Sequence, residues 1–174
     1  MTPVARRGFF FVPKPALLSQ SSQLTSQNRN SHVQACLAMM LIDLKAELAK
    51  LTTFRDRKPT STRAERQGSS SQLAPYRDAT IFANKSAGRG AWERHADGDE
   101  LVHVLDGAAT LQIATEGGLQ SFDVRAGMLA IVPKGVWHRF HYPDGVTLMT
   151  VTPGQSDYIR IDTDDPLSAE PQRD

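Results

Sequence analysis

The chain is predicted to fold as a small all-β domain, a sandwich or a barrel, preceded by one helix. From Tyr76 onward, short apolar stretches alternate with turns that contain Gly, Pro or Asp, at a spacing typical of such folds. The 174 residues suffice for one domain, and 40% hydrophobic with 22% charged residues is normal for a globular protein. The single cysteine, Cys36, cannot form an internal disulfide, so the core alone must stabilise the fold.

The first forty residues differ in composition from the rest, since they contain no Asp or Glu and are rich in Ser and Gln. This composition is typical of an organelle transit peptide, and Arg6-Arg7 is faintly similar to a twin-arginine export signal. Alternatively, translation begins at Met39 or Met40, and the preceding residues are a disordered tail or an artefact. We expect residues 1–39 to be dispensable for the fold, because they lack hydrophobic periodicity.

One amphipathic helix of about three turns is expected from Leu41 to Leu51, where leucines recur at helical spacing. The helix should end before Pro59 and serve in packing. Residues 55–71 are charged and rich in Ser, which is typical of a linker or a mobile arm. We therefore assign residues 40–72 to helix and linker.

Residues 73–155 are expected to form the β-domain. The predicted strands are 80–84, 91–95, 100–105, 108–114, 119–124, 128–132, 137–142 and 147–151. Asp106-Gly107 is typical of a hairpin turn, so strands 100–105 and 108–114 are expected to pair with each other. Residues 156–174 are assigned to a C-terminal tail, exposed and acidic from Asp162 onward.

Two histidines and two carboxylates on neighbouring predicted strands indicate a divalent metal site. Glu93 and His95 are two positions apart, so on a strand they face the same side. Glu100 leads directly into an apolar strand, and His138 follows a turn with Pro and Gly. Imidazole and carboxylate ligands together suit first-row transition metals better than calcium or a thiolate site.

The spacing of these residues resembles the cupin family. The family's first motif is Gly-x5-His-x-His-x3-4-Glu-x6-Gly, and this chain has Glu93-x-His95-x4-Glu100-x6-Gly107. The second motif is Gly-x5-Pro-x-Gly-x2-His-x3-Asn, and this chain has Gly127-x5-Pro133-x-Gly135-x2-His138-x3-Tyr142. Over residues 73–155 the resemblance implies a jelly-roll barrel, also called a double-stranded β-helix.

The resemblance also implies a metal-ligand set in which Glu93 stands where the family has its first histidine. The expected ligands are His95, Glu100 and His138, with Glu93 as a fourth ligand or as a catalytic general base. Glu93 could instead pair with an arginine, Arg94 or Arg125, in a metal-free pocket. Iron, manganese, nickel and zinc are the expected metals, and an extra carboxylate favours iron(II) or manganese over copper.

Two functions remain open on this basis. The first is a metal-dependent enzyme, an oxygenase or an isomerase, acting on a small polar molecule. The second is a non-catalytic module that binds a small ligand as a sensor, without metal. A net charge of +1 argues against nucleic acid as a partner, and no apolar run reaches the roughly 20 residues that span a membrane.

We expect a cytoplasmic homodimer. A small barrel has strand edges to protect, and two-fold association is the commonest kind of oligomer. The predicted helix and the apolar residues Ile81, Phe82 and Trp92 offer surface for the partner chain.

Overall fold

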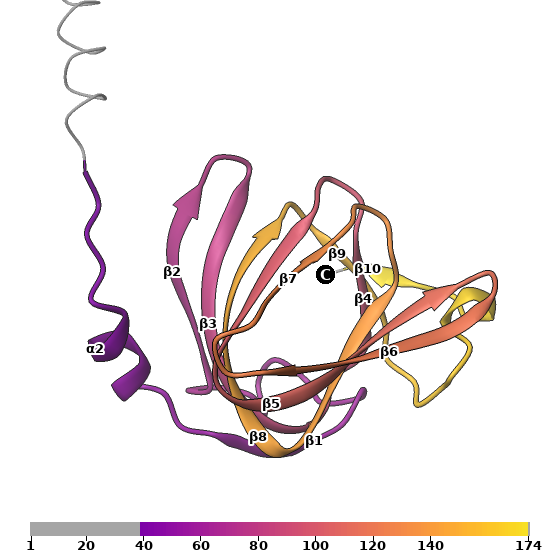
Figure 1. Ribbon diagram of the computed structural model, residues 1–174, viewed down its shortest axis with the longest axis horizontal. Helices are drawn as coiled ribbons and strands as arrows, with labels where there is room; N and C mark the ends of the chain where they lie inside the picture. The colour runs from indigo at the N-terminus through magenta and orange to yellow at the C-terminus, as the bar shows by residue number, and fades with distance from the viewer. Residues whose placement is uncertain (1–38, 174) are drawn as a thin grey trace, which may run out of the picture. The chain divides into compact units, whose positions relative to one another are not determined.

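The computed structural model describes residues 39–173, and ten strands of this described part are hydrogen-bonded into one sheet that curls on itself (Figure 1). The elements are α2 (Leu44–Ala49), β1 (Phe54–Arg57), β2 (Ser70–Tyr76), β3 (Ala79–Arg89), β4 (Trp92–His95), β5 (Glu100–Thr115), β6 (Gly118–Arg125), β7 (Leu129–Val132), β8 (His138–Pro153), β9 (Ser156–Ile159), the 3-10 turn η1 (Pro166–Ser168) and β10 (Gln172–Arg173). The all-β class and the single short helix are thereby confirmed. The predictions for residues before Met39 lie outside the described residues.

Two long strands, β5 and β8, organise the sheet. β8 pairs with β3, β4 and β5, and β5 pairs with β6 and β7 as well. All these pairs are antiparallel, whereas β1 joins β3 in parallel.

Among the described residues, the helices are too short or too polar to span a membrane.

The predicted hairpin at Asp106-Gly107 is wrong, because β5 continues through this dipeptide. Its first half pairs with β7 and its second half with β6, while β8 runs along both halves. Gly107 has φ +79°, and a Cβ there would collide with the carbonyl oxygen of Gly145. Gly145, with φ +105°, lies within β8. The two glycines therefore let both long strands bend together, which is how a sheet turns a barrel corner.

The helix α2 is shorter than the predicted range of 41–51. The Asp43 carboxylate accepts a hydrogen bond from the Ala46 N–H at 3.0 Å, and this N-cap makes the helix begin at Leu44. The Lys85 side chain of β3 donates to the carbonyl oxygen of Leu48 at 2.8 Å, so the helix is attached to the sheet.

The expected linker at residues 55–71 is packed against the sheet. β1 lies in this segment and pairs with β3, with Phe54 opposite Ser86. At its far end the carbonyl oxygen of Ser69 accepts from the backbone N–H of Lys85 at 2.8 Å. The segment that was expected to be a linker or a mobile arm is therefore hydrogen-bonded to β3 at both of its ends.

The C-terminal segment also continues the sheet beyond residue 155. β9 pairs with β4, and β10 pairs with β9. The acidic residues are exposed as expected, but they reach arginines of the sheet. Asp162 lies 2.7 Å from Arg89, and Asp164 pairs with the buried Arg139, which also donates to the carbonyl oxygen of Thr163 at 2.8 Å.

The core consists of two groups of buried side chains. The larger lies mainly between β5 and β8 and contains Val102, Val104, Ala109, Leu111, Val124, Val132, Phe140, Tyr142, Val146 and Leu148. The smaller contains Trp92, Ala114, Trp137 and Ile159. Trp92 is completely buried, so the expectation that it offers surface to a partner chain is wrong.

Candidate functional site

His95, Glu100 and His138 come together where three strands meet. His95 ends β4, Glu100 begins β5 and His138 begins β8, and all three side chains are buried. One potential ligand atom from each residue lies within 4.8 Å of the others. The backbone N–H of Gly135 donates to the carbonyl oxygen of His95 at 2.8 Å, which ties the turn before β8 to the end of β4.

The ring nitrogens of the two histidines are oriented toward one point. His138 Nδ1 lies 3.1 Å from the carbonyl oxygen of Val136, and the Ser156 hydroxyl lies 3.1 Å from His95 Nδ1. Both Nε2 atoms thus face Glu100 Oε2, at 3.0 Å from His138 and 3.3 Å from His95. In metal sites, the imidazole nitrogen that does not bind the metal usually forms such a hydrogen bond, which fixes the orientation of the ring.

His95 Nε2 is a buried nitrogen without a hydrogen-bond partner in the described part of the chain. A buried polar atom that stays unpaired costs free energy, so its presence calls for an explanation. Two imidazole nitrogens and one carboxylate oxygen form a donor set that suits a first-row transition metal, with positions left for other ligands. A divalent metal at this point would complete the bonding of His95 Nε2, and the residues present therefore fit the ion.

The three residues also influence each other's ionisation. Burial alone would raise the pKa of Glu100, but the hydrogen bond from His138 and the nearby His95 outweigh it and lower the pKa to about 2. Burial alone would lower the pKa of His138, but the hydrogen bond and charge of Glu100, with the charge of Glu93, raise it above 6.5. Glu100 is therefore held as a carboxylate, the form that binds a metal.

Glu93 lies at the edge of this group. Its Oε1 is 3.7 Å from His138 Nε2, and 26% of its side chain is exposed to solvent. Glu93 and His138 are directly opposite each other in the β4–β8 pair. Arg94 is ion-paired with Asp157 at 3.0 Å and is not a partner of Glu93. The structure thus places Glu93 beside the three buried residues, as the spacing predicts, but farther out.

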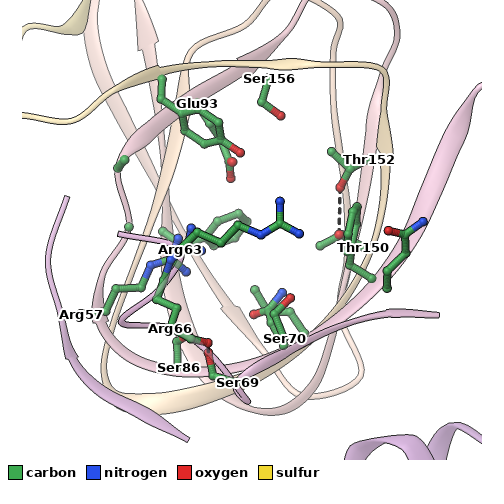
Figure 2. A pocket seen from close by; sticks show the side chains of 18 of the residues that line it. Arg57, Arg63, Arg66, Ser69, Ser70, Ser86, Glu93, Thr150, Thr152 and Ser156 are labelled. Atoms are coloured by element: carbon green, nitrogen blue, oxygen red, sulfur yellow. Dashed lines mark hydrogen bonds between the residues drawn. The ribbon is translucent and has the colours of Figure 1, made fainter. Parts of the chain in front are cut away.

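A cavity of ≈ 910 Å³ opens beside the site. Glu93, Glu100 and Ser156 line it together with several hydroxyl groups, and Figure 2 shows Glu93, Ser156 and Thr152 around one end. The Thr152 hydroxyl donates to Glu100 Oε1 at 2.6 Å. The cavity also contains three arginines, Arg57, Arg63 and Arg66.

Sequence reasoning missed Ser156, Thr152 and the three arginines. Ser156 and Thr152 lie outside both motifs and reach the site through strand pairing, which the sequence does not reveal. The arginines lie in the segment expected to be a linker, and their clustering within ten positions was the only available signal.

Comparison with known proteins agrees with this architecture. Residues 83–152 match the family described as the cupin domain. An acireductone dioxygenase of Rhodopseudomonas palustris (strain TIE-1) is 41% identical over 62 residues, which are 36% of this chain and 33% of that protein. The chain thus matches about a third of the length of this curated relative.

One solved structure shows a similar fold. A protein of Neisseria meningitidis is 23% identical and gives a TM-score of 0.51, covering 66% of this chain and 100% of its own. A cupin-2 domain-containing protein of Shewanella frigidimarina is 24% identical with a TM-score of 0.49, covering 66% and 95%.

Proposed function

We propose that this chain binds one divalent transition metal through His95, Glu100 and His138 and acts on a small polar molecule in the adjoining cavity. The match of residues 83–152 to the cupin domain supports this. The observation that supports this most directly is the buried His95 Nε2, which has no hydrogen-bond partner among the described residues and faces the same carboxylate oxygen as His138 Nε2. Iron, manganese, nickel and zinc are the candidate ions.

A metal at this position would supply Lewis acidity or dioxygen activation. The protein's own residues define the rest of the chemistry. Ser156 and the Val136 carbonyl orient the two imidazoles, and Thr152 orients Glu100. Glu93 faces the cavity from beside His138, so it is placed to accept a proton from a bound molecule or to act as a fourth ligand.

Oxygenation is the first reaction class to test. The relative from Rhodopseudomonas palustris is named as a dioxygenase, and its match extends over 62 residues of this chain. Isomerisation of small oxo-acids or sugars is the second class, since it needs the same metal and a base such as Glu93.

Metal binding is tested by titration of the metal-free protein with iron(II), manganese, nickel and zinc in a calorimeter. We expect one ion per chain, and His95→Ala or His138→Ala should weaken binding by on the order of 100-fold or more, because each removes a direct ligand. His103→Ala is the matched control, since His103 is a half-buried histidine of β5 outside the site. Substoichiometric metal, or equal affinity in all these variants, would contradict the proposal.

A metal-free binding module is the second candidate function. It is favoured by the hydrogen bond between His138 and Glu100, which already satisfies two of the three buried groups. It predicts that the chain binds a small ligand in the cavity with the same affinity before and after treatment with a chelator.

A further inference from the structure

Three arginines gather in the cavity beside the proposed metal site. Arg57 ends β1, and Arg63 and Arg66 follow in the turn that leads to β2. Figure 2 shows their side chains reaching toward the cavity, with Glu93 and Ser156 across from them. All three precede residues 83–152, so they lie outside the part that matches the family.

The position of Arg57 depends on an unusually close contact between β1 and β3. Gly88 of β3 has φ +124°, and a Cβ at this residue would collide with the backbone of Arg57. Only glycine lets the two strands approach this closely. The Arg57 guanidinium then donates to the hydroxyl of Tyr142 at 2.7 Å, which points the charge into the cavity wall.

The turn that contains the other two arginines is locally stabilised. The backbone N–H of Thr62 donates to the Glu65 carboxylate at 2.7 Å, and the N–H of Glu65 donates to the Thr62 hydroxyl at 3.2 Å. This reciprocal pair is a capping box, and it begins one helical turn. Residues three apart share a face of such a turn, so Arg63 and Arg66 project in the same direction.

None of the three arginines forms an ion pair with a carboxylate of the described residues. Arg66 donates to the carbonyl oxygen of Thr62 at 3.3 Å. Burial and the neighbouring charge of Arg57 lower the pKa of Arg66, and the negative charge of Glu93 across the cavity opposes this only in part.

We propose that the cavity binds a small organic anion whose oxyanion group, a carboxylate or a phosphate, is held by Arg57, Arg63 and Arg66. Guanidinium groups form bidentate hydrogen bonds with both carboxylates and phosphates. A cavity of ≈ 910 Å³ is large enough for a small metabolite. The rest of the molecule then extends toward Glu93 and Glu100. That this anion is the substrate rests on the proposed function, whereas its binding by the arginines does not.

The test is calorimetric titration of the metal-free full chain with succinate in one arm and inorganic phosphate in the other. We expect at least one anion to bind, and the tighter one identifies the oxyanion group. Arg63→Gln should weaken that binding by about 10-fold or more, because it removes a charged hydrogen-bond donor. Arg63→Lys should retain part of the affinity, since it keeps the charge but not the planar fork.

Arg63 suits this test because it is exposed and has no hydrogen bond or ion pair among the described residues, so its substitution leaves the fold intact. Arg125→Gln is the matched control, because Arg125 is an exposed arginine of β6 outside the cavity. Absence of binding in both arms, or equal affinities in Arg63→Gln and the wild type, would overturn the inference.

Metal titration of the same Arg63→Gln protein separates this inference from the proposed function. Metal affinity should equal that of the wild type, because Arg63 is not a ligand. Anion binding without metal binding would support the arginine site and refute the metal centre. Metal binding without anion binding would support the metal centre and refute the arginine site.

Discussion

At the scale of residues, hydrogen bonds fix the orientation of the side chains in the site, and one of their nitrogen atoms lacks a hydrogen-bond partner. Ser156 and the Val136 carbonyl fix the two imidazole rings, and Glu100 is held by Thr152 and His138. Among the described residues, His95 Nε2 is the one buried side-chain nitrogen or oxygen without a hydrogen-bond partner. A buried polar atom without a partner is rare in folded proteins, and a bound metal ion would complete the bonding of this one.

At the same scale, substitutions of Glu93 distinguish an enzyme from a binding module. Glu93→Gln preserves the size of the side chain but removes its charge, so turnover should fall by roughly 10²–10⁴-fold if Glu93 is the general base. Glu93→His should raise metal affinity, because it adds a third imidazole beside His95 and His138. Activity assays for oxygen consumption and isomerisation, with metal titrations, measure both effects.

Glu116→Gln is the control for the lost charge, since Glu116 is exposed in the turn between β5 and β6. If neither substitution at Glu93 alters metal affinity, stability or any activity, Glu93 has no role in the site.

At the scale of elements, the C-terminal segment closes the end of the sheet that contains the site. Ser156 begins β9, so the strand that the sequence assigned to a tail also supplies the partner of His95. Asp157, the next residue, accepts from Arg173 of β10 at 2.9 Å and from Arg94 of β4 at 3.0 Å. This carboxylate therefore links three strands.

The Asp157 link should make stability depend on pH. The hydrogen bonds from Arg173 and Arg94 hold the pKa of Asp157 below its usual value of 3.8. A lowered pKa in the folded state contributes stability above pH 3.8, and this contribution is lost as the pH falls through the folded value. Asp157→Asn should therefore lower the melting temperature by a few degrees at pH 7, and by progressively less below pH 3.8.

Thermal melts of the metal-free protein across this pH range measure the difference. Asp144→Asn, at an exposed residue of the β8 bend, should leave the melting temperature unchanged. A difference between Asp157→Asn and the wild type that stays constant as the pH falls would show that the ion pairs do not stabilise the fold.

At the scale of the whole molecule, the described residues form one curled sheet (Figure 1). The candidate metal ligands lie where β4, β5 and β8 meet, and the three arginines line the cavity beside them. The burial of Trp92 removes one of the residues expected at a chain–chain contact, while Ile81 and Phe82 are half-buried. The homodimer stays a prediction.

We expect a solution mass of twice the chain mass of 19.1 kDa. Light scattering at micromolar concentration measures it directly, since a small barrel with open strand edges is expected to associate. A mass of one chain at every concentration tested would refute the dimer.

The all-β class and the candidate ligands His95, Glu100 and His138 could be predicted from the sequence, because strand periodicity and the spacing of cupin-like motifs are local properties. What depends on long-range strand pairing required the folded structure. Asp106-Gly107 became a bend because Gly145 of another strand lies against it, and Ser156 and Arg63 reach the cavity only because distant segments pack together. A glycine with positive φ suits a hairpin turn as well as a bend within a strand, so only the neighbouring strand distinguishes the two.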